Sequence, residues 1–511
     1  MGEYLLAHDI GTSGNKATLF TAEGELVKSC VISYDAHYFR DTWVEQNAED
    51  WWRAVCSSSK KIIESTGIAA EEIEAVSFSG QMMGCLCVDK NGKPLRPSII
   101  WADQRAREQV MRIEREISQQ EFYHISGHRN TASYGIQKLM WIRDNEPEVY
   151  ANTYKVLNAK DYIIFKLTGE FLTDPSDANG FTCFDLKTFR WSDRILDCTG
   201  IDKAKLPEIV PSVHVAGRVT KEAAAHTGLR QGTPVVVGGG DGVVANIGCG
   251  STEPGRTYCC MGTSAWITTT SRKPVYDEQM RTVTWAHVIP GMYAPNGTMQ
   301  YAGGSYSWVK NTICTAEMEK AEQTGQSPYD FMDERIRESA VGSNGIIFLP
   351  YLLGERAPRW DADAKGAWIG LKPENTKGDI LRSVLEGVTM NLSICLDILR
   401  TQMEIQEITV VGGGAKSPVW RQIMADIFNA RIKVPRLLEE GGSMGAAVIA
   451  GVGTGIYSNF SAIHHFIKVE QEQKPDAAAA GDYEKIKKMF DLYYFALKDA
   501  FQKTADTANK G

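Results

Sequence analysis

The sequence lacks the features of several large classes of protein. No stretch approaches the ~18 apolar residues of a membrane span, and residues 1–4 carry neither a basic region nor a cleavage-site pattern. Lysine and arginine number 55 against 63 aspartate and glutamate residues, so the net charge is −8 and no broad basic surface is available to nucleic acid. We therefore expect a cytoplasmic protein with no membrane and no nucleic acid as a partner.

Disulfide and metal-cage motifs are also missing. The 11 cysteines are odd in number, form no Cys-x-x-Cys pair, and lie in apolar segments such as 85–87. This pattern favours reduced thiols in the core over disulfides or a metal cage.

Two common nucleotide-binding loops are missing as well. No Gly-x-x-x-x-Gly-Lys-[Ser/Thr] occurs, which excludes a P-loop. The glycines of residues 451–455 lack the spacing and the preceding strand of a dinucleotide fingerprint, which argues against a dehydrogenase.

What the chain does have is the size and composition of a two-domain globular protein. Its 511 residues are 43% hydrophobic and 23% charged. One hydrophobic core rarely serves so long a chain, so we expect two domains of roughly 200 to 250 residues. The cleft between two domains is a common place for a small-molecule site.

A β-hairpin with a polar tip occurs twice. Residues 4–10 and 16–21 read as strands around Gly11-Thr12-Ser13-Gly14, and residues 256–261 and 265–270 as strands around Gly262-Thr263-Ser264. Such a tip presents backbone N–H groups and hydroxyls that suit phosphate oxygens. One tip alone is also explained by the needs of a tight turn, but two favour a polyphosphate held between the halves.

A second recurring pattern is a buried strand that opens into three glycines and then a helix. Residues 234–237 lead into Gly238-Gly239-Gly240, and residues 408–411 lead into Gly412-Gly413-Gly414. The helices are predicted over residues 243–247 and 419–428. We interpret this as a duplicated α/β unit, with the boundary between the halves within residues 242–255.

Further elements are predicted from periodicity alone. Helices are expected over residues 50–65 and 138–145, and a strand over residues 75–79. After residue 480, apolar residues recur at steps of three and four, which predicts an amphipathic closing helix that packs on the core.

Two aspartates stand out by position. Asp9 ends an apolar strand, a costly place for an uncompensated carboxylate, and Asp241 follows the three glycines. Two acids at the ends of separate strands could hold Mg²⁺ through waters and orient a hydroxyl, as phosphoryl transfer requires. For either acid alone, a helix N-cap or a turn is an equally good explanation.

Together these segments resemble the FGGY carbohydrate kinases, and among them the xylulose kinases most closely, over about residues 4–460. Residues 9–14 are similar to the first phosphate motif, 239–241 to the catalytic-base motif, 261–264 to the second phosphate motif and 412–415 to the adenosine motif. The C-terminal signature is matched by residues 366–371 with Asp379, Ser383 and Glu386. The N-terminal signature fits at residues 138–141 but has Gly135 where Pro, Ser or Thr is usual.

The resemblance implies an α/β fold of two actin-like, ribonuclease-H-like ATPase domains, residues 1–245 and 246–511, with an interdomain cleft. The first domain would bind the sugar and the second the nucleotide, with ATP and Mg²⁺ as cofactors and a homodimer as the assembly. Asp241 would be the catalytic base, and Asp9 and Asp241 would lie at the metal. Nucleotide contacts would come from Gly11, Thr12, Ser13, Gly262, Thr263, Gly413, Gly414 and Ala415.

The sugar-binding residues follow the pattern less closely. Xylulose kinases have Gly-Gln-Met-His-Gly where this chain has Gly80-Gln81-Met82-Met83-Gly84, and a thioether cannot donate the hydrogen bond of an imidazole N–H. Residues 101–105 match a Trp, Asp and Arg pattern, with Ala102 in place of Asn. Core packing is the competing explanation for the methionines and the tryptophan. The expected acceptor contacts are Gln81, Met82, Met83, Trp101, Asp103 and Asp241.

The resemblance thus predicts a kinase that transfers the γ-phosphate of ATP to a small ketose, D-xylulose or a near relative, giving D-xylulose 5-phosphate in the first case. Alternatives in the same class are another ketose, an alditol, a sugar acid or a linear signalling sugar. More distant alternatives are an actin-like ATPase without a sugar acceptor and a sugar-sensing regulator.

Overall fold

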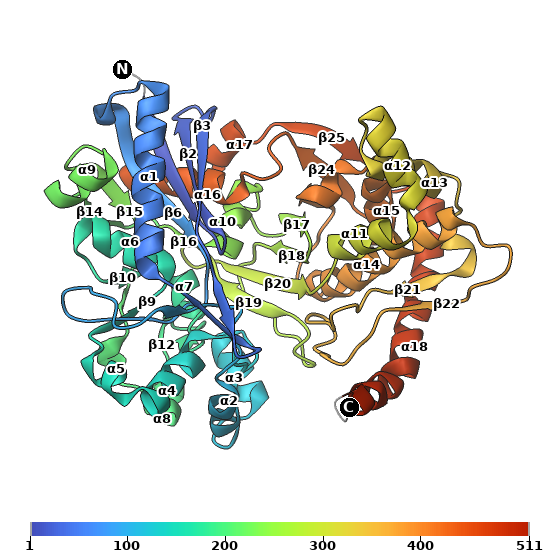
Figure 1. The fold of residues 1–511 in the computed structure, drawn as a ribbon, viewed down its shortest axis with the longest axis horizontal. Helices are drawn as coiled ribbons and strands as arrows, with labels where there is room; N and C mark the ends of the chain where they lie inside the picture. The colour runs from blue at the N-terminus through green and yellow to red at the C-terminus, as the bar shows by residue number, and fades with distance from the viewer. Residues whose placement is uncertain (1–2, 509–511) are drawn as a thin grey trace.

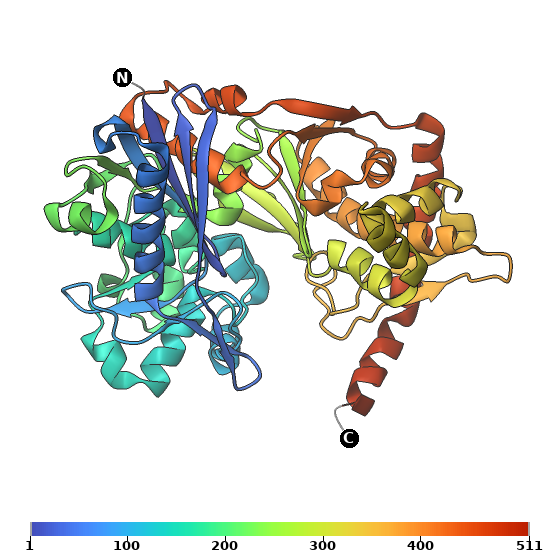
Figure 2. The same cartoon turned by 45° about the horizontal axis from the view of Figure 1, so that its top comes forward.

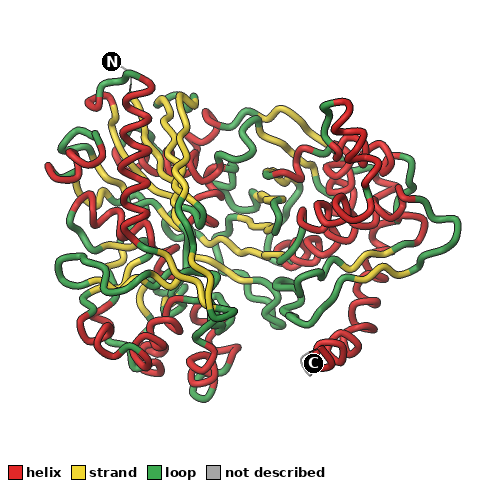
Figure 3. Tube along the Cα trace, in the orientation of Figure 1, coloured by secondary structure: helices red, strands yellow, loops and turns green. Residues whose placement is uncertain are grey.

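The computed structural model describes residues 3–508 and shows two lobes side by side, each built on a seven-stranded sheet (Figure 1). The first sheet has the order β14-β15-β6-β1-β2-β3, with β16 also paired to β6, and the second has the order β19-β20-β18-β17-β23-β24-β25. Helices pack around both sheets, and the first sheet has helices on both of its faces (Figure 3). This is the two-domain α/β fold that the sequence predicts.

The strand bounds are as follows. The first sheet consists of β1 (Tyr4–Ile10), β2 (Gly14–Thr21), β3 (Leu26–Ser33), β6 (Ile73–Gly80), β14 (Val215–Arg218), β15 (Pro234–Val236) and β16 (Gly239–Gly240). The second consists of β17 (Thr257–Met261), β18 (Ala265–Thr269), β19 (Val283–Ala286), β20 (Tyr293–Met299), β23 (Glu407–Val411), β24 (Arg431–Pro435) and β25 (Val469–Gln473).

Both predicted hairpins are confirmed. Strand β1 pairs antiparallel with β2, so that Asp9 stands opposite Lys16. Strand β17 pairs antiparallel with β18, and Met261 stands opposite Ala265. In each sheet a third antiparallel strand continues on one side, and two parallel strands continue on the other, giving β3-β2-β1-β6-β15 and β20-β18-β17-β23-β24. The duplication predicted from the hairpins is therefore present.

Our alignment of the two glycine runs is wrong. Residues 234–237 lie in the outer parallel strand of the first sheet, the place of β24, whereas residues 408–411 lie in the inner parallel strand, the place of β6. Glycine recurs because both segments leave the sheet against a neighbouring backbone. A Cβ on Gly238 would lie 2.1 Å from the Phe78 carbonyl oxygen, and one on Gly412 would lie 2.8 Å from that of Met261. The two segments share a composition, but they occupy different positions in their sheets.

Helix bounds follow local capping chemistry. Helix α1 (Ala48–Thr66) begins where the Asn47 side chain accepts from the Glu49 N–H, and it ends at Gly67 in the left-handed conformation. Helix α14 (Lys377–Arg400) begins with a capping box between Thr376 and Asp379. Helices α4 (Gly135–Asn145) and α15 (Pro418–Phe428) contain the predicted residues 138–145 and 419–428.

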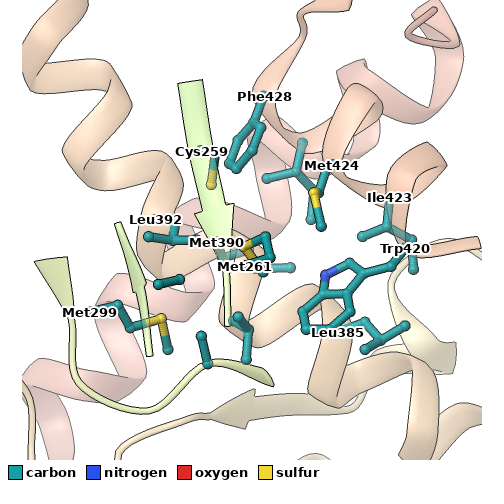
Figure 4. Packing of buried hydrophobic residues seen from close by; sticks show 14 of the residues in the cluster. Cys259, Met261, Met299, Leu385, Met390, Leu392, Trp420, Ile423, Met424 and Phe428 are labelled. Atoms are coloured by element: carbon teal, nitrogen blue, oxygen red, sulfur yellow. The ribbon is translucent and has the colours of Figure 1, made fainter. Parts of the chain in front are cut away.

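The family signature on α14 has a structural role. The Asp379 carboxylate accepts from Ser339 and from the Thr376 N–H, while Glu386 accepts from Ser343 and Tyr483 and pairs with Arg382 at 2.7 Å. The bond from Tyr483 ties α14 to the closing helix α18 (Ala477–Ala508), which packs on the second core as predicted. Figure 4 shows that core between β17 and the helices, with Trp420, Leu385 and Met261 in contact.

One helix from late in the chain packs on the first sheet. Helix α16 (Gly441–Thr454) contacts β1, β6 and α10 (Asp241–Gly248), and Figures 1 and 2 show this orange-red segment among the blue strands. A Cβ on Gly445 would lie 2.2 Å from the Val244 carbonyl oxygen. The two helices therefore cross so closely that only glycine fits at residue 445. The predicted domain boundaries stay a prediction, because packing does not follow chain order.

All eleven cysteines are free and at least half-buried, as predicted. Within residues 3–508, no helix combines the length and the apolar character that crossing a membrane requires.

Candidate active site

A cavity lined by both lobes adjoins a second cavity lined by the second lobe alone. A cavity of about 530 Å³ is lined by Asp9, Asp241 and Met83 from the first lobe and by Ser264 and Gly412 from the second. A cavity of about 620 Å³ lies wholly against the second lobe and reaches Gly262, Thr263, Gly413 and Gly414. The turn at residues 262–264 contributes to both, so the two spaces adjoin at this turn.

Asp241 is the first residue of α10 and lies at the wall of the 530 Å³ cavity. Burial raises the pKa of its carboxyl group to about 7, and the charge of Asp9 acts in the same direction. Its Oδ1 accepts from the Gly242 N–H at 2.7 Å. A carboxylate that titrates near neutral pH is suited to accept a proton from a hydroxyl.

Asp9 lies on β1 with its carboxylate toward the same cavity. Burial raises the pKa of Asp9, while a 2.8 Å hydrogen bond from Ser79 and the charge of Lys16 lower it. A Cβ on Gly442, at the start of α16, would lie 2.8 Å from Asp9 Oδ2. The glycine therefore lets the helix start approach the acid.

A buried polar cluster supports the loop that carries Asp241. Ser176 Oγ accepts from the Gly240 N–H at 2.9 Å and donates to Asp174 at 2.6 Å. Asp174 in turn lies 3.1 Å from Lys160 Nζ, and both are fully buried. The residue before Asp241 is thus held by a chain of bonds that sequence reasoning missed, since no local pattern links residues 160, 174 and 240.

The first hairpin turn is fixed by its neighbours. The Gly11 N–H donates to the Gly14 carbonyl at 3.0 Å, and the Tyr34 hydroxyl donates to the Gly11 carbonyl at 2.6 Å. Gly11 lines the 530 Å³ cavity. Thr12 and Ser13 are outside its lining, and the Thr12 hydroxyl accepts from Trp101 Nε1 at 2.8 Å.

The predicted nucleotide residues of the second lobe are largely brought together. Gly262, Thr263, Gly413 and Gly414 line the 620 Å³ cavity. Ala415 is fully buried, and its carbonyl accepts from Arg421 at 2.6 Å. Sequence reasoning missed the remaining polar and aromatic lining: Tyr306, Ser307, Ser327, Tyr329, Asp330, Asp333, Lys416, Ser417 and Trp420.

Four predicted acceptor residues line the 530 Å³ cavity, namely Met82, Met83, Trp101 and Asp241. Met83 has a φ of 62°, a left-handed conformation uncommon for a side chain of its size. The conformation is held by Lys138 Nζ, which is fully buried and donates to the carbonyls of Met83, Ile100 and Ser133. Burial lowers the pKa of Lys138 to about 7. The N-terminal signature lysine therefore shapes the acceptor wall.

Two predicted acceptor residues do not reach the cavity lining. Gln81 donates to the Gln46 side chain at 2.7 Å and lies beneath the first turn. Asp103 is fully buried, pairs with Arg105 at 2.7 Å and accepts from the Val44 N–H at 2.6 Å. Its oxygens hold the loop that carries Trp101, so the structure gives Asp103 an anchoring role where we expected a substrate contact.

Two lobes of one topology, with two acids and paired turns at their junction, define the actin-like class of phosphotransferase folds. Within that class the chain belongs to the FGGY family of carbohydrate kinases: residues 4–248 match the model of the N-terminal domain and residues 257–454 that of the C-terminal domain. It is a phosphotransferase with an alcohol group as acceptor.

Curated relatives carry two different names. The chain is 31% identical to a xylulose kinase of Staphylococcus xylosus over 96% of this chain and 99% of that protein. It is 30% identical to a gluconokinase of Bacillus licheniformis over 99% of this chain and 98% of that protein. The crystal structure of a gluconate kinase from Lactobacillus acidophilus superposes with a TM-score of 0.91 at 27% identity, covering 99% of this chain and 100% of that one.

Proposed function

We propose that this chain transfers the γ-phosphate of ATP to a hydroxyl of a small sugar, with Asp241 as the base. The observation that carries the proposal is the place of Asp241, a carboxyl group with a pKa of about 7 on the wall of a cavity lined by both lobes. D-Xylulose, the acceptor predicted from sequence, and D-gluconate are the two acceptors that the names of the relatives suggest.

The chain's own residues supply positioning and proton transfer. The turns at Gly11 and at Gly262-Thr263 offer backbone N–H groups to the phosphates of ATP, and the 620 Å³ cavity accommodates the nucleoside between Tyr306, Tyr329 and Trp420. Asp241 accepts the proton of the acceptor hydroxyl as the new P–O bond forms. Much of the rate gain comes from in-line positioning, because in a loose transition state the base accepts the proton only late in the reaction.

The two acids fit a magnesium ion. The charge of Asp9 raises the pKa of Asp241, and within residues 3–508 no ion pair is formed by the Asp241 carboxylate. Two carboxylates with waters and phosphate oxygens are a typical Mg²⁺ environment. Mg²⁺ there would neutralise charge on the phosphates. The homodimer and the cytoplasmic location stay predictions.

The test is acceptor-stimulated ADP release, measured against ketoses, alditols and sugar acids of five and six carbons. We expect strong stimulation by at least one acceptor. ATP hydrolysis at one rate with every acceptor and with none would contradict the proposal and favour an actin-like ATPase.

A further inference from the structure

The strongest unassigned feature of the cleft is the guanidinium of Arg356. This residue lies in the loop between β21 (Ile347–Leu349) and β22 (Ala367–Ile369), and it lines the 530 Å³ cavity together with Asp241. It also lines an adjoining cavity of about 660 Å³ that Asp9 and Asp241 do not reach. Arg356 therefore lies where the acceptor space continues away from the reacting end.

The Arg356 side chain has no charged partner. Among residues 3–508 its guanidinium takes part in no ion pair and no hydrogen bond, and it lies 5.7 Å from the Trp101 ring centroid. Burial lowers the pKa of Arg356, and the nearby Tyr134 and Glu355 act in the opposite direction. Arg359, three residues on, pairs with Asp491 at 2.6 Å and donates to Tyr351 at 2.9 Å. A half-buried cation without a partner is costly unless a ligand supplies the negative charge.

The neighbouring acid, Glu355, forms no ion pair with the guanidinium. Glu355 Oε1 accepts from the backbone N–H groups of Gln300 and Arg356 at 2.6 and 2.8 Å, and Oε2 accepts from Asn391 at 2.8 Å. Burial raises the pKa of Glu355 to about 8, against the effect of these bonds. The Glu355 oxygens are thus engaged by other donors, and Arg356 and Glu355 are the charged side chains of the 660 Å³ lining.

Trp101 connects the two ends of the site. Its Nε1 donates to the Thr12 hydroxyl in the first phosphate turn, while its ring faces Arg356. Met83 and Trp101 line both the 530 and the 660 Å³ cavities. A linear acceptor whose hydroxyl lies at Asp241 would run along Trp101 and end at the guanidinium.

We propose that Arg356 binds the carboxylate of a sugar acid, so that the preferred acceptor is an aldonate rather than a neutral ketose or alditol. The proposal rests on the proposed function and names the acceptor class of that same site. A planar guanidinium matches a carboxylate with two parallel hydrogen bonds. One unpaired cation balances a monoanion, which favours a carboxylate over the dianion of a sugar phosphate. Asn296, Thr298 and Gln300 line the same space and can bind hydroxyls.

The experiment measures kcat/KM for aldonates of five and six carbons, each beside the alditol of the same configuration, which differs only in carrying CH2OH for the carboxylate. D-Xylulose and a sugar phosphate complete the panel. The wild-type chain should prefer the best aldonate over its alditol by on the order of 10²-fold or more. Arg356→Met should remove that preference, with most of the change in KM, while Arg356→Lys retains part of it.

Arg359→Lys is the matched control, because it alters a paired guanidinium in the same loop and should leave the aldonate-to-alditol ratio unchanged. A wild-type preference for neutral acceptors or for the sugar phosphate would overturn the inference. So would an Arg356→Met variant of unchanged melting temperature that loses the same factor on every acceptor. Failure of the proposed function gives a different result, since then no acceptor stimulates ADP release.

Discussion

At the scale of single residues, the chemistry centres on an acid that the fold makes weak. Asp241 was identified from sequence by its place after three glycines, but its environment was not. Burial and the charge of Asp9 raise its pKa, and both depend on residues brought from β1 and α16. Side-chain type is visible in sequence, whereas the dielectric and the neighbouring charges are not.

Asp241→Asn should lower kcat on the order of 10²-fold or more, because an amide cannot accept the proton of the acceptor hydroxyl. ATP should still bind, since the turns and the nucleotide cavity are unaltered. The melting temperature should be unchanged or higher, because the substitution removes a buried charge beside Asp9. Near-normal turnover would show that another group is the base.

The pH dependence follows from the same carboxyl group. Only the deprotonated form of Asp241 can accept a proton, so kcat/KM should fall roughly tenfold per pH unit below about 7 and level off above it. Asp9→Asn should move the bend of this profile to lower pH, because the Asp9 charge raises the Asp241 pKa. Steady-state measurements of kcat/KM across the pH range would give both profiles. A wild-type profile without a bend near pH 7 would contradict the assignment.

Residue types alone did not tell which motif residues line the cavity. Asp103 and Gln81 matched the acceptor pattern but anchor loops, while Arg356 drew no attention because a single arginine in a loop has no periodic or spacing signal. A buried partner of a carboxylate, such as Arg105 beside Asp103, decides whether a motif residue faces the ligand or the core. That pairing is a tertiary property.

At the scale of elements, the strands and helices were largely predictable because their apolar periods are strong. Strand β1 has the predicted bounds, and α10 and α15 contain the predicted helices. What could not be predicted was the partner of each element. We matched β15 with β23 as equivalent strands because each runs into three glycines, but the two occupy different positions in their sheets. Nothing in residues 441–454 indicates that α16 crosses to the other sheet.

The α10 and α16 crossing should be sensitive to volume. Gly445→Val would place atoms against the Val244 carbonyl oxygen, where even a Cβ would lie at 2.2 Å. We expect a loss of about 1–3 kcal/mol in the free energy of unfolding and a fall in kcat, because the start of α16 would move from Asp9. Denaturant unfolding and steady-state assays would measure the two effects.

Gly481→Ala is the control for this variant. It lies exposed in α18 with nothing within 4 Å of the added Cβ, so it should be neutral or stabilising by up to about 1 kcal/mol. If both variants behave alike, close helix crossing is not what requires glycine at residue 445.

At the scale of the whole molecule, the reacting groups come from both lobes, so their distance depends on how the lobes sit. Asp9 and Asp241 face Ser264 and Gly412 across a 530 Å³ cavity. Binding of ATP and acceptor together should close the lobes and exclude water, which suppresses wasteful hydrolysis.

Small-angle scattering should therefore record a smaller radius of gyration with a non-hydrolysable ATP analogue and acceptor than with either alone. The ATP analogue alone and the acceptor alone serve as the controls. An unchanged radius in the ternary complex would contradict closure.

The return of α16 to the first sheet also has a consequence for synthesis. Tyr457 donates to the Ala22 carbonyl at 2.7 Å, and Thr18 donates to Ser443, so the first lobe is completed by residues made more than 420 positions later. Until then, apolar residues of its sheet such as Leu5, Ala7 and Phe20 lack their cover. At ~5–20 residues per second on the ribosome, that face stays bare for tens of seconds. The first lobe leaves the ribosome early but cannot finish folding until residues 441–454 have emerged, and a nascent chain halted before residue 441 presents an open apolar surface to chaperones and to other nascent chains.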